Sequence, residues 1–98
     1  EIYAQICIET FALIQKVYPN GLAKENVVTM SGLMAHIFMS LDRWRCGNFI
    51  EATDVKKLKK EHKRKYEEIE IYLKKVGEIL NIYIDPIEII AILRYMLF

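Results

Sequence analysis

The sequence predicts an all-α protein, folded as a compact bundle of four to five helices. Apolar residues recur at helical spacing along most of the chain. Only four glycines and two prolines are available for turns and hairpins. An apolar content of 53% over 98 residues is enough for one hydrophobic core and typical of a globular domain.

The first helix is expected from Ile2 to Val17. Its main apolar stripe consists of Ile2, Ile6, Leu13, Ile14 and Val17, and is widened by Tyr3, Ile8 and Phe11. Because the stripe is wide, this helix is expected to be buried on more than one side. Pro19 disfavours helical geometry at Tyr18, and Asn20-Gly21 readily adopts positive φ, so residues 18–21 are expected to form a turn.

A second helix is expected to begin between Lys24 and Ser31 and to run to about Cys46. Gly47-Asn48 is a natural stop for it. The residues at helical spacing on its inner face are Leu33, His36, Ile37, Ser40, Leu41 and Trp44. A linker through Ala52 is expected to follow.

The third helical segment is long and is expected to be one helix or two, with a break near Tyr66. Thr53 or Asp54 is suited to cap its start by accepting a hydrogen bond from a free backbone N–H. Residues 55–66 are polar nearly all round and should be mostly solvated. The second half carries an apolar face made of Ile69, Tyr72, Leu73, Val76, Ile79 and Leu80.

The last helix is expected to follow a short connector, residues 81–84, and to run to the C-terminus. Asp85 suits the N-cap, and Pro86 suits the first helical position, where its missing N–H costs nothing. Glu88 then lies at the third position, near the positive end of the helix dipole.

Overall charge points to no particular partner. The net charge is only +1, although seven of the fourteen basic residues lie between Lys56 and Lys65. That run is suited to phosphate binding, but few aromatic residues and no groove-reading pattern accompany it, so a solvated helix face is the favoured interpretation. No stretch reaches the roughly 18 uninterrupted apolar residues of a membrane-spanning helix.

No catalytic, metal or cofactor site is predicted. Ser31 and Ser40 lack an associated base and carboxylate, and no glycine-rich phosphate loop is present. Cys7 and Cys46 lie in different expected helices without metal-ligand spacing, which favours two reduced thiols in a cytoplasmic protein. We therefore expect a regulatory or interaction module rather than an enzyme.

His36 is the position with the most chemical potential, because an imidazole in the middle of an apolar helix face can act as a base, a ligand or a phosphoryl acceptor. Its neighbours one turn away, Gly32 and Ser40, are small and would leave the ring approachable. Arg43 returns to nearly the same face about 10 Å along the axis, where it could read an anion on His36. The alternative is a hydrogen-bonded interior histidine, with Gly32 permitting close helix contact.

The segment Leu33-Met34-Ala35-His36-Ile37-Phe38-Met39-Ser40-Leu41-Asp42-Arg43, followed by Gly47, resembles a known family. It is similar to the phosphotransferase-system regulation domain, or PRD, of bacterial antiterminators and transcriptional activators of sugar genes. In that family an apolar residue follows a histidine, an arginine lies seven positions on, and a glycine comes soon after. Residues 82–93 resemble the closing segment of the family, so the resemblance spans nearly the whole chain.

The resemblance implies a five-helix bundle, often dimeric, in which His36 is the phosphoacceptor and Arg43 a phosphate-sensing or switch residue. The implied donor is the histidine phosphocarrier protein or an enzyme II B component. Two positions depart from the family pattern. Many members have Asp where this chain has Ala35, and the second family histidine falls on Tyr95, so at most one of the usual two sites is left.

Phosphorylation of His36 is then expected to act as a charge switch on the dimer contact or on neighbouring domains. Two alternatives stay open: a helical dimerisation module that has lost phosphorylation, and a nucleic-acid binder that uses Lys56 to Lys65. Residues 1–98 are expected to form one PRD-like domain. Since the chain begins at Glu1, it is interpreted as a fragment of a larger regulator or a trimmed stand-alone module.

Overall fold

The computed structural model describes residues 1–18 and 24–97, without the side chains of 24–30 and of 97. The described residues form five helices: α1 (Ile2–Val17), α2 (Lys24–Arg45), α3 (Val55–Glu61), α4 (Lys63–Leu80) and α5 (Glu88–Leu97). No strand occurs among them, so the predicted all-α bundle is confirmed. Beyond Tyr18, the turn expected over residues 18–21 lies outside the described residues.

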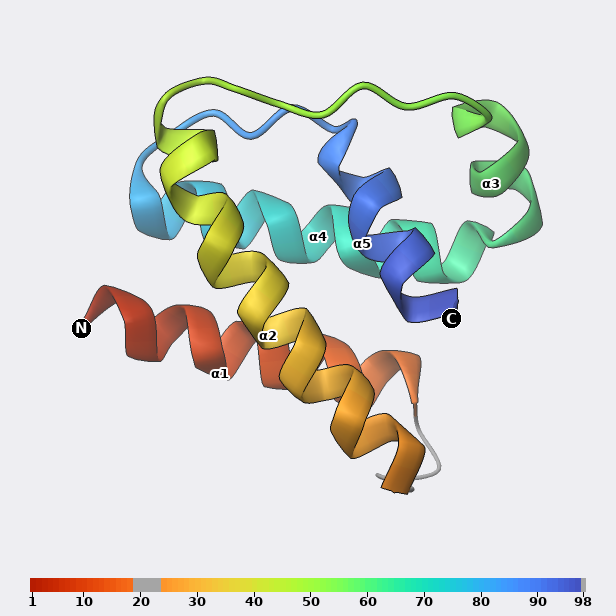
Figure 1. Cartoon of the computed structure of the whole chain (residues 1–98), viewed down its shortest axis with the longest axis horizontal. Helices are drawn as coiled ribbons and strands as arrows, with labels where there is room; N and C mark the ends of the chain where they lie inside the picture. The colour runs from red at the N-terminus through yellow and green to blue at the C-terminus, as the bar shows by residue number, and fades with distance from the viewer. Residues whose placement is uncertain (19–23, 98) are drawn as a thin grey trace.

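Helix α4 contacts α1, α3 and α5, whereas α2 packs against α1 and α5. In Figure 1, α2 runs obliquely across α1, and α5 packs against both α2 and α4. Helix α3 lies at the N-terminal end of α4. The radius of gyration is 12.9 Å, close to the ~13 Å expected for a compact chain of this length. None of the described helices is long and apolar enough to cross a membrane.

The core lies between α1, α2, α4 and α5. It consists of Ile6, Leu13, Ile14, Leu33, Ile37, Leu41, Trp44, Tyr66, Ile69, Tyr72, Leu73, Val76, Ile89, Ile90, Ile92, Leu93 and Met96. The apolar residues predicted for the inner faces of α2 and α4 lie in this core or pack against it. One buried polar contact joins α1 to α4, because the Thr10 hydroxyl lies 2.7 Å from the Tyr72 hydroxyl and also donates to the Ile6 carbonyl.

Only one face of α1 is buried, and the expectation of burial on more than one side is wrong. Ile2, Tyr3, Ile8 and Phe11 are 40–66% exposed. The reason is the packing arrangement: α4 covers one face of α1, and α2 crosses it obliquely rather than lying along it. The extra apolar residues therefore lie on the exposed surface of α1 and do not widen its buried stripe.

The third segment is two helices, and the break lies at His62 rather than near Tyr66. Tyr66 is only 6% exposed and belongs to the core face of α4. The expected N-cap of α3 is also only partly right. Asp54 holds that position, but its backbone is left-handed, with φ 60°, and its side chain makes no capping hydrogen bond. Capping side chains normally come from residues with extended backbone.

The other helix signals act largely as predicted. Gly47 ends α2 with φ +73°, a conformation that suits glycine, and the Asn48 amide donates to the Arg43 carbonyl at 2.9 Å. The Asp85 carboxylate accepts a hydrogen bond from the Ile87 amide at 2.9 Å, which caps the turn leading into α5. The predicted helix start at Asp85 and Pro86 is too early, because residues 86 and 87 form a turn and the regular helix begins at Glu88.

Candidate functional site

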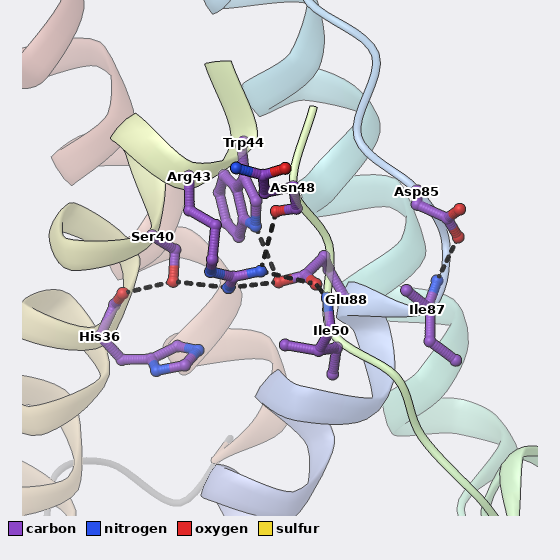
Figure 2. A network of polar contacts seen from close by, with 9 residues as sticks. All are labelled: His36, Ser40, Arg43, Trp44, Asn48, Ile50, Asp85, Ile87 and Glu88. Carbon is purple, nitrogen blue, oxygen red and sulfur yellow. Dashed lines mark hydrogen bonds and ion pairs between the residues drawn. The ribbon is translucent and has the colours of Figure 1, made fainter. Parts of the chain in front are cut away.

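The candidate site lies where the C-terminal half of α2 faces α5. Its central contact joins Arg43 on α2 to Glu88, the first residue of α5 (Figure 2). The guanidinium donates to both carboxylate oxygens, from Nη2 to Oε1 at 2.7 Å and from Nη1 to Oε2 at 3.1 Å. The Glu88 side chain is fully buried, whereas that of Arg43 is 31% exposed. Such two-point pairing fixes the geometry of both side chains.

Two further donors hold the same carboxylate. The Trp44 indole Nε1 donates to Oε1 and the Ile50 amide donates to Oε2, each at 2.7 Å. Burial raises the pKa of Glu88, but the hydrogen bonds from Arg43, Ile50 and Trp44 outweigh this effect, so its pKa lies below its ordinary value. Glu88 is therefore a buried, ionised residue that ties α2, the segment after it and α5 together.

Sequence reasoning placed Glu88 at a helix start but missed this role. A glutamate three residues after an N-cap normally satisfies backbone N–H groups of its own helix. Here its carboxylate accepts hydrogen bonds from donors that lie 38 to 45 positions earlier in the chain. The apolar residues around Glu88 could have indicated this role. Glu88 lies between Ile87 and Ile89, and a charged side chain within a buried apolar run requires a partner.

His36 lies two turns before Arg43 on α2, and its ring points toward the Arg43 side chain in Figure 2. A chain of contacts connects the two residues, since the Ser40 hydroxyl donates to the His36 carbonyl at 2.8 Å and accepts from Arg43 Nη2 at 3.3 Å. The imidazole stacks on the ring of Tyr95, with ring centres 5.9 Å apart and planes 26° apart. His36 therefore contacts Tyr95 near the end of α5 and is linked through Ser40 and Arg43 to Glu88 at its start.

The imidazole Nε2 is buried and makes no hydrogen bond to any described residue. Burial lowers the pKa of His36, and the positive charge of Arg43 lowers it further, while the negative charge of Glu88 acts in the opposite direction. The net effect favours a neutral ring. A neutral imidazole with an unpaired nitrogen can act as a nucleophile. If it accepted a phosphoryl group, the negative charge of that group would lie near the positive charge of Arg43.

The ring is less approachable than the small neighbours of His36 suggested. The hydroxyl of Tyr95 lies against Gly32, where it would overlap any added Cβ. Ser40 is engaged by Arg43 and by the His36 carbonyl. The expected opening between Gly32 and Ser40 is thus filled from α5. The alternative of a hydrogen-bonded interior histidine does not describe Nε2 either, because that atom has no partner among the described residues.

The other candidate features lie away from this site. The side chains of the basic run on α3 and the start of α4 are mostly exposed, and α3 buries none, in keeping with a solvated helix face. Cys7 and Cys46 are free thiols. In the part of the chain that the structure describes, no three His, Cys, Asp or Glu side chains gather in a way that would hold a metal ion. A groove of about 640 Å³ lies between α4 and the connection to α5, and His36 is not among its lining residues.

A family model described as the PRD domain matches residues 9–98. This range includes His36, Arg43, Glu88 and Tyr95, and covers nearly the whole chain. No curated protein and no solved structure gives a match. The extent of the family match, together with the five-helix bundle, identifies the chain as a member of the PRD domain family.

Proposed function

We propose that this domain is a cytoplasmic regulatory switch for bacterial sugar-gene transcription or antitermination, operated through phosphorylation of His36 by the phosphotransferase system. The donor in this proposal is the histidine phosphocarrier protein or an enzyme II B component. Membership of the PRD domain family supports the general role. The observation that carries the choice of residue is the ring of His36, which combines a lowered pKa with an unpaired Nε2.

The chemistry requires a neutral imidazole, and the lowered pKa of His36 favours that form at neutral pH. A lone pair on the ring attacks the phosphorus atom of the donor's phosphohistidine. As the new N–P bond forms, the N–P bond in the donor breaks and its electron pair returns to the donor imidazole. Charge repulsion from Glu88 opposes the incoming phosphoryl group, and the positive charge of Arg43 offsets this repulsion.

The switch follows from the charge that phosphorylation adds. A phosphoryl group brings about −1.5 to −2 charges and three strong acceptor oxygens. Arg43, which is partly exposed and already close enough to affect the pKa of His36, then has a second anion to pair with besides Glu88. A change in this pairing loosens the contact between α2 and α5, and in a dimer or a multidomain regulator this alters the neighbouring interface.

The test is transfer of labelled phosphate from phosphoenolpyruvate, through the general phosphotransferase proteins, to the wild type, His36→Ala and His62→Ala. Label on the wild type and on His62→Ala, but not on His36→Ala, is the expected result. His62 is the matched control because it is the other histidine of the chain and lies at the junction of α3 and α4. Label on His36→Ala equal to that on the wild type would refute the assignment.

A second candidate function is a dimerisation module that has lost phosphorylation. Tyr95 favours it, because this residue stands where the family has its second histidine and also covers the first. The two functions differ in their response to a negative charge at residue 36. Sedimentation of the wild type and His36→Asp should give the same dimer if the module is purely structural, whereas a change in the dimer on substitution favours the switch.

A further inference from the structure

Tyr95 covers His36 in a way that differs from the other contacts of the site. Its ring lies nearly parallel to the imidazole, with ring centres 5.9 Å apart and planes 26° apart. Tyr95 itself is 37% exposed, whereas the Nε2 atom of the imidazole beside it is buried. The cover over His36 is thus a surface side chain in the last turn of α5, rather than part of the core.

Gly32 supplies the space for this cover. A Cβ built at Gly32 would overlap the Tyr95 hydroxyl oxygen and lie 2.8 Å from the ring carbon that bears it. Only glycine lets the tyrosine lie this close to α2 at that turn. Gly32 lies on α2 and Tyr95 on α5, so the position of the Tyr95 ring over His36 depends on the contact between these helices. It can be tested by substituting either residue.

The remaining neighbours of His36 are poorly suited to move. Ser40 and Arg43 are joined to each other, and Arg43 is joined to Glu88 at two points. The backbone of α5 is also held near Tyr95, because the Tyr18 hydroxyl donates to the Met96 carbonyl at 2.9 Å. Uncovering His36 by moving the helix would break these bonds, whereas rotating the exposed Tyr95 side chain leaves them intact.

We propose that Tyr95 is a gating residue for His36: its ring closes over the imidazole, its hydroxyl end occupies the gap left by Gly32, and a phosphoryl donor reaches Nε2 only after the ring swings outward. The inference rests on the proposed phosphorylation of His36 and adds a positioning residue to it. A phosphoryl group is larger than the space around a buried ring nitrogen, so the closed arrangement and the phosphorylated one exclude each other. Reactivity at His36 is therefore set by the fraction of open molecules.

The gate can be tested without any partner protein by using phosphoramidate, a small phosphoryl donor. In that reaction an imidazole lone pair attacks phosphorus, the P–N bond of phosphoramidate breaks, and the leaving nitrogen takes up a proton to depart as ammonia. His62 serves as an internal reference within each molecule. The measured quantity is the ratio of phosphate on His36 to phosphate on His62 at early times, read by mass spectrometry of peptides kept at alkaline pH.

Four variants separate the gate from a general effect on folding. Tyr95→Ala removes the cover, and Gly32→Ala displaces it while placing a strong helix former in α2. Tyr95→Phe keeps the ring, and Tyr83→Ala removes an exposed tyrosine from the connection before α5. If the open form is a minor state of at most ~10%, the ratio should rise by about tenfold or more in the first two variants and stay at the wild-type value in the last two.

An unchanged ratio in Tyr95→Ala and Gly32→Ala, with helical circular dichroism retained, would overturn the gate. So would an equal rise in Tyr95→Phe, since that variant keeps the covering ring. The natural donor provides a separate measurement. Label from the phosphocarrier on wild-type His36 with no change in the phosphoramidate ratio leaves the proposed function standing and removes the gate. A raised ratio with no label from the carrier in any variant supports the gate and removes the proposed donor.

Discussion

Helix α2 meets α5 at two places that are built in opposite ways. At the start of α5, the buried Glu88 carboxylate accepts hydrogen bonds from Arg43, Trp44 and the Ile50 amide. In the last turn of α5, the partly exposed ring of Tyr95 stacks on His36, whose Nε2 has no partner among the described residues. One contact is saturated with hydrogen bonds, and the other leaves a buried polar atom unpaired.

This difference assigns different roles to the two contacts. A buried ion pair with every oxygen satisfied is costly to disturb, because any missing partner leaves a charge or a donor unpaired. A partly exposed ring can leave its place at modest cost, since a stacked aromatic pair contributes only about 0.5–1.5 kcal/mol beyond its buried area. The Glu88 contact is therefore suited to hold the two helices in register before phosphorylation, and the His36–Tyr95 contact is suited to open while that register is kept.

The largest expected effect comes from Glu88→Ala. This substitution leaves the Trp44 indole and the Ile50 amide without their acceptor, and Arg43 without its anion. We expect a loss of roughly 3–5 kcal/mol in the free energy of unfolding, measured by urea denaturation. Glu67→Ala, at an exposed position on α4, should change stability by less than about 0.5 kcal/mol. Equal losses in the two variants would contradict the anchoring role of Glu88.

A smaller effect is expected from pH, because both contacts contain a titrating group. The pKa of His36 is lowered in the folded state from its ordinary value of 6.5, so the folded protein binds a proton less readily than the unfolded chain. The free energy of unfolding should therefore rise with pH until about pH 6.5 and stay level above it. The lowered pKa of Glu88 acts in the same direction below its ordinary value of 4.5.

Replacing His36 by Gln isolates its share of this pH dependence. The variant should show a shallower rise in stability between pH 5 and pH 7 than the wild type, as measured by urea denaturation at fixed ionic strength. The expected change is smaller than the loss in Glu88→Ala, since one partly exposed ring is involved. His62→Gln is the matched control for changing a histidine elsewhere. A slope in His36→Gln as steep as in the wild type would show that another group titrates in this range.

The helices of this chain were predictable because their signals are local. The spacing of Leu33, Ile37, Leu41 and Trp44 marked the buried face of α2, and all four residues are in the core. The signals failed where tertiary contacts decide. Whether the apolar residues on the outer side of α1 are buried or exposed depends on how α2 crosses α1, which no local pattern shows. No local pattern distinguished a break at His62 from one near Tyr66 either.

Half of the candidate site was predictable, because local spacing along one helix reveals some of its residues and tertiary contacts supply the others. His36 and Arg43 lie on one helix, so their shared face follows from helical geometry. Glu88 and Tyr95 lie about 50 positions further along the chain, and their contacts with α2 depend on the docking of α5. The small residue Gly32 indicated open space beside His36, but it cannot reveal that a side chain from another helix fills that space.

The smallest expected effect compares the same chemical change at two tyrosines. Tyr72→Phe removes a buried hydroxyl that lies 2.7 Å from the Thr10 hydroxyl, and should lower the free energy of unfolding by about 0.5–1.5 kcal/mol. Tyr95→Phe removes a hydroxyl from a residue that is 37% exposed, and the change should stay below about 0.5 kcal/mol. Urea midpoints of the two variants, measured side by side, give the comparison. A loss at Tyr95 as large as that at Tyr72 would mean that the Tyr95 hydroxyl is firmly held, which is incompatible with a ring that swings away from His36 at little cost.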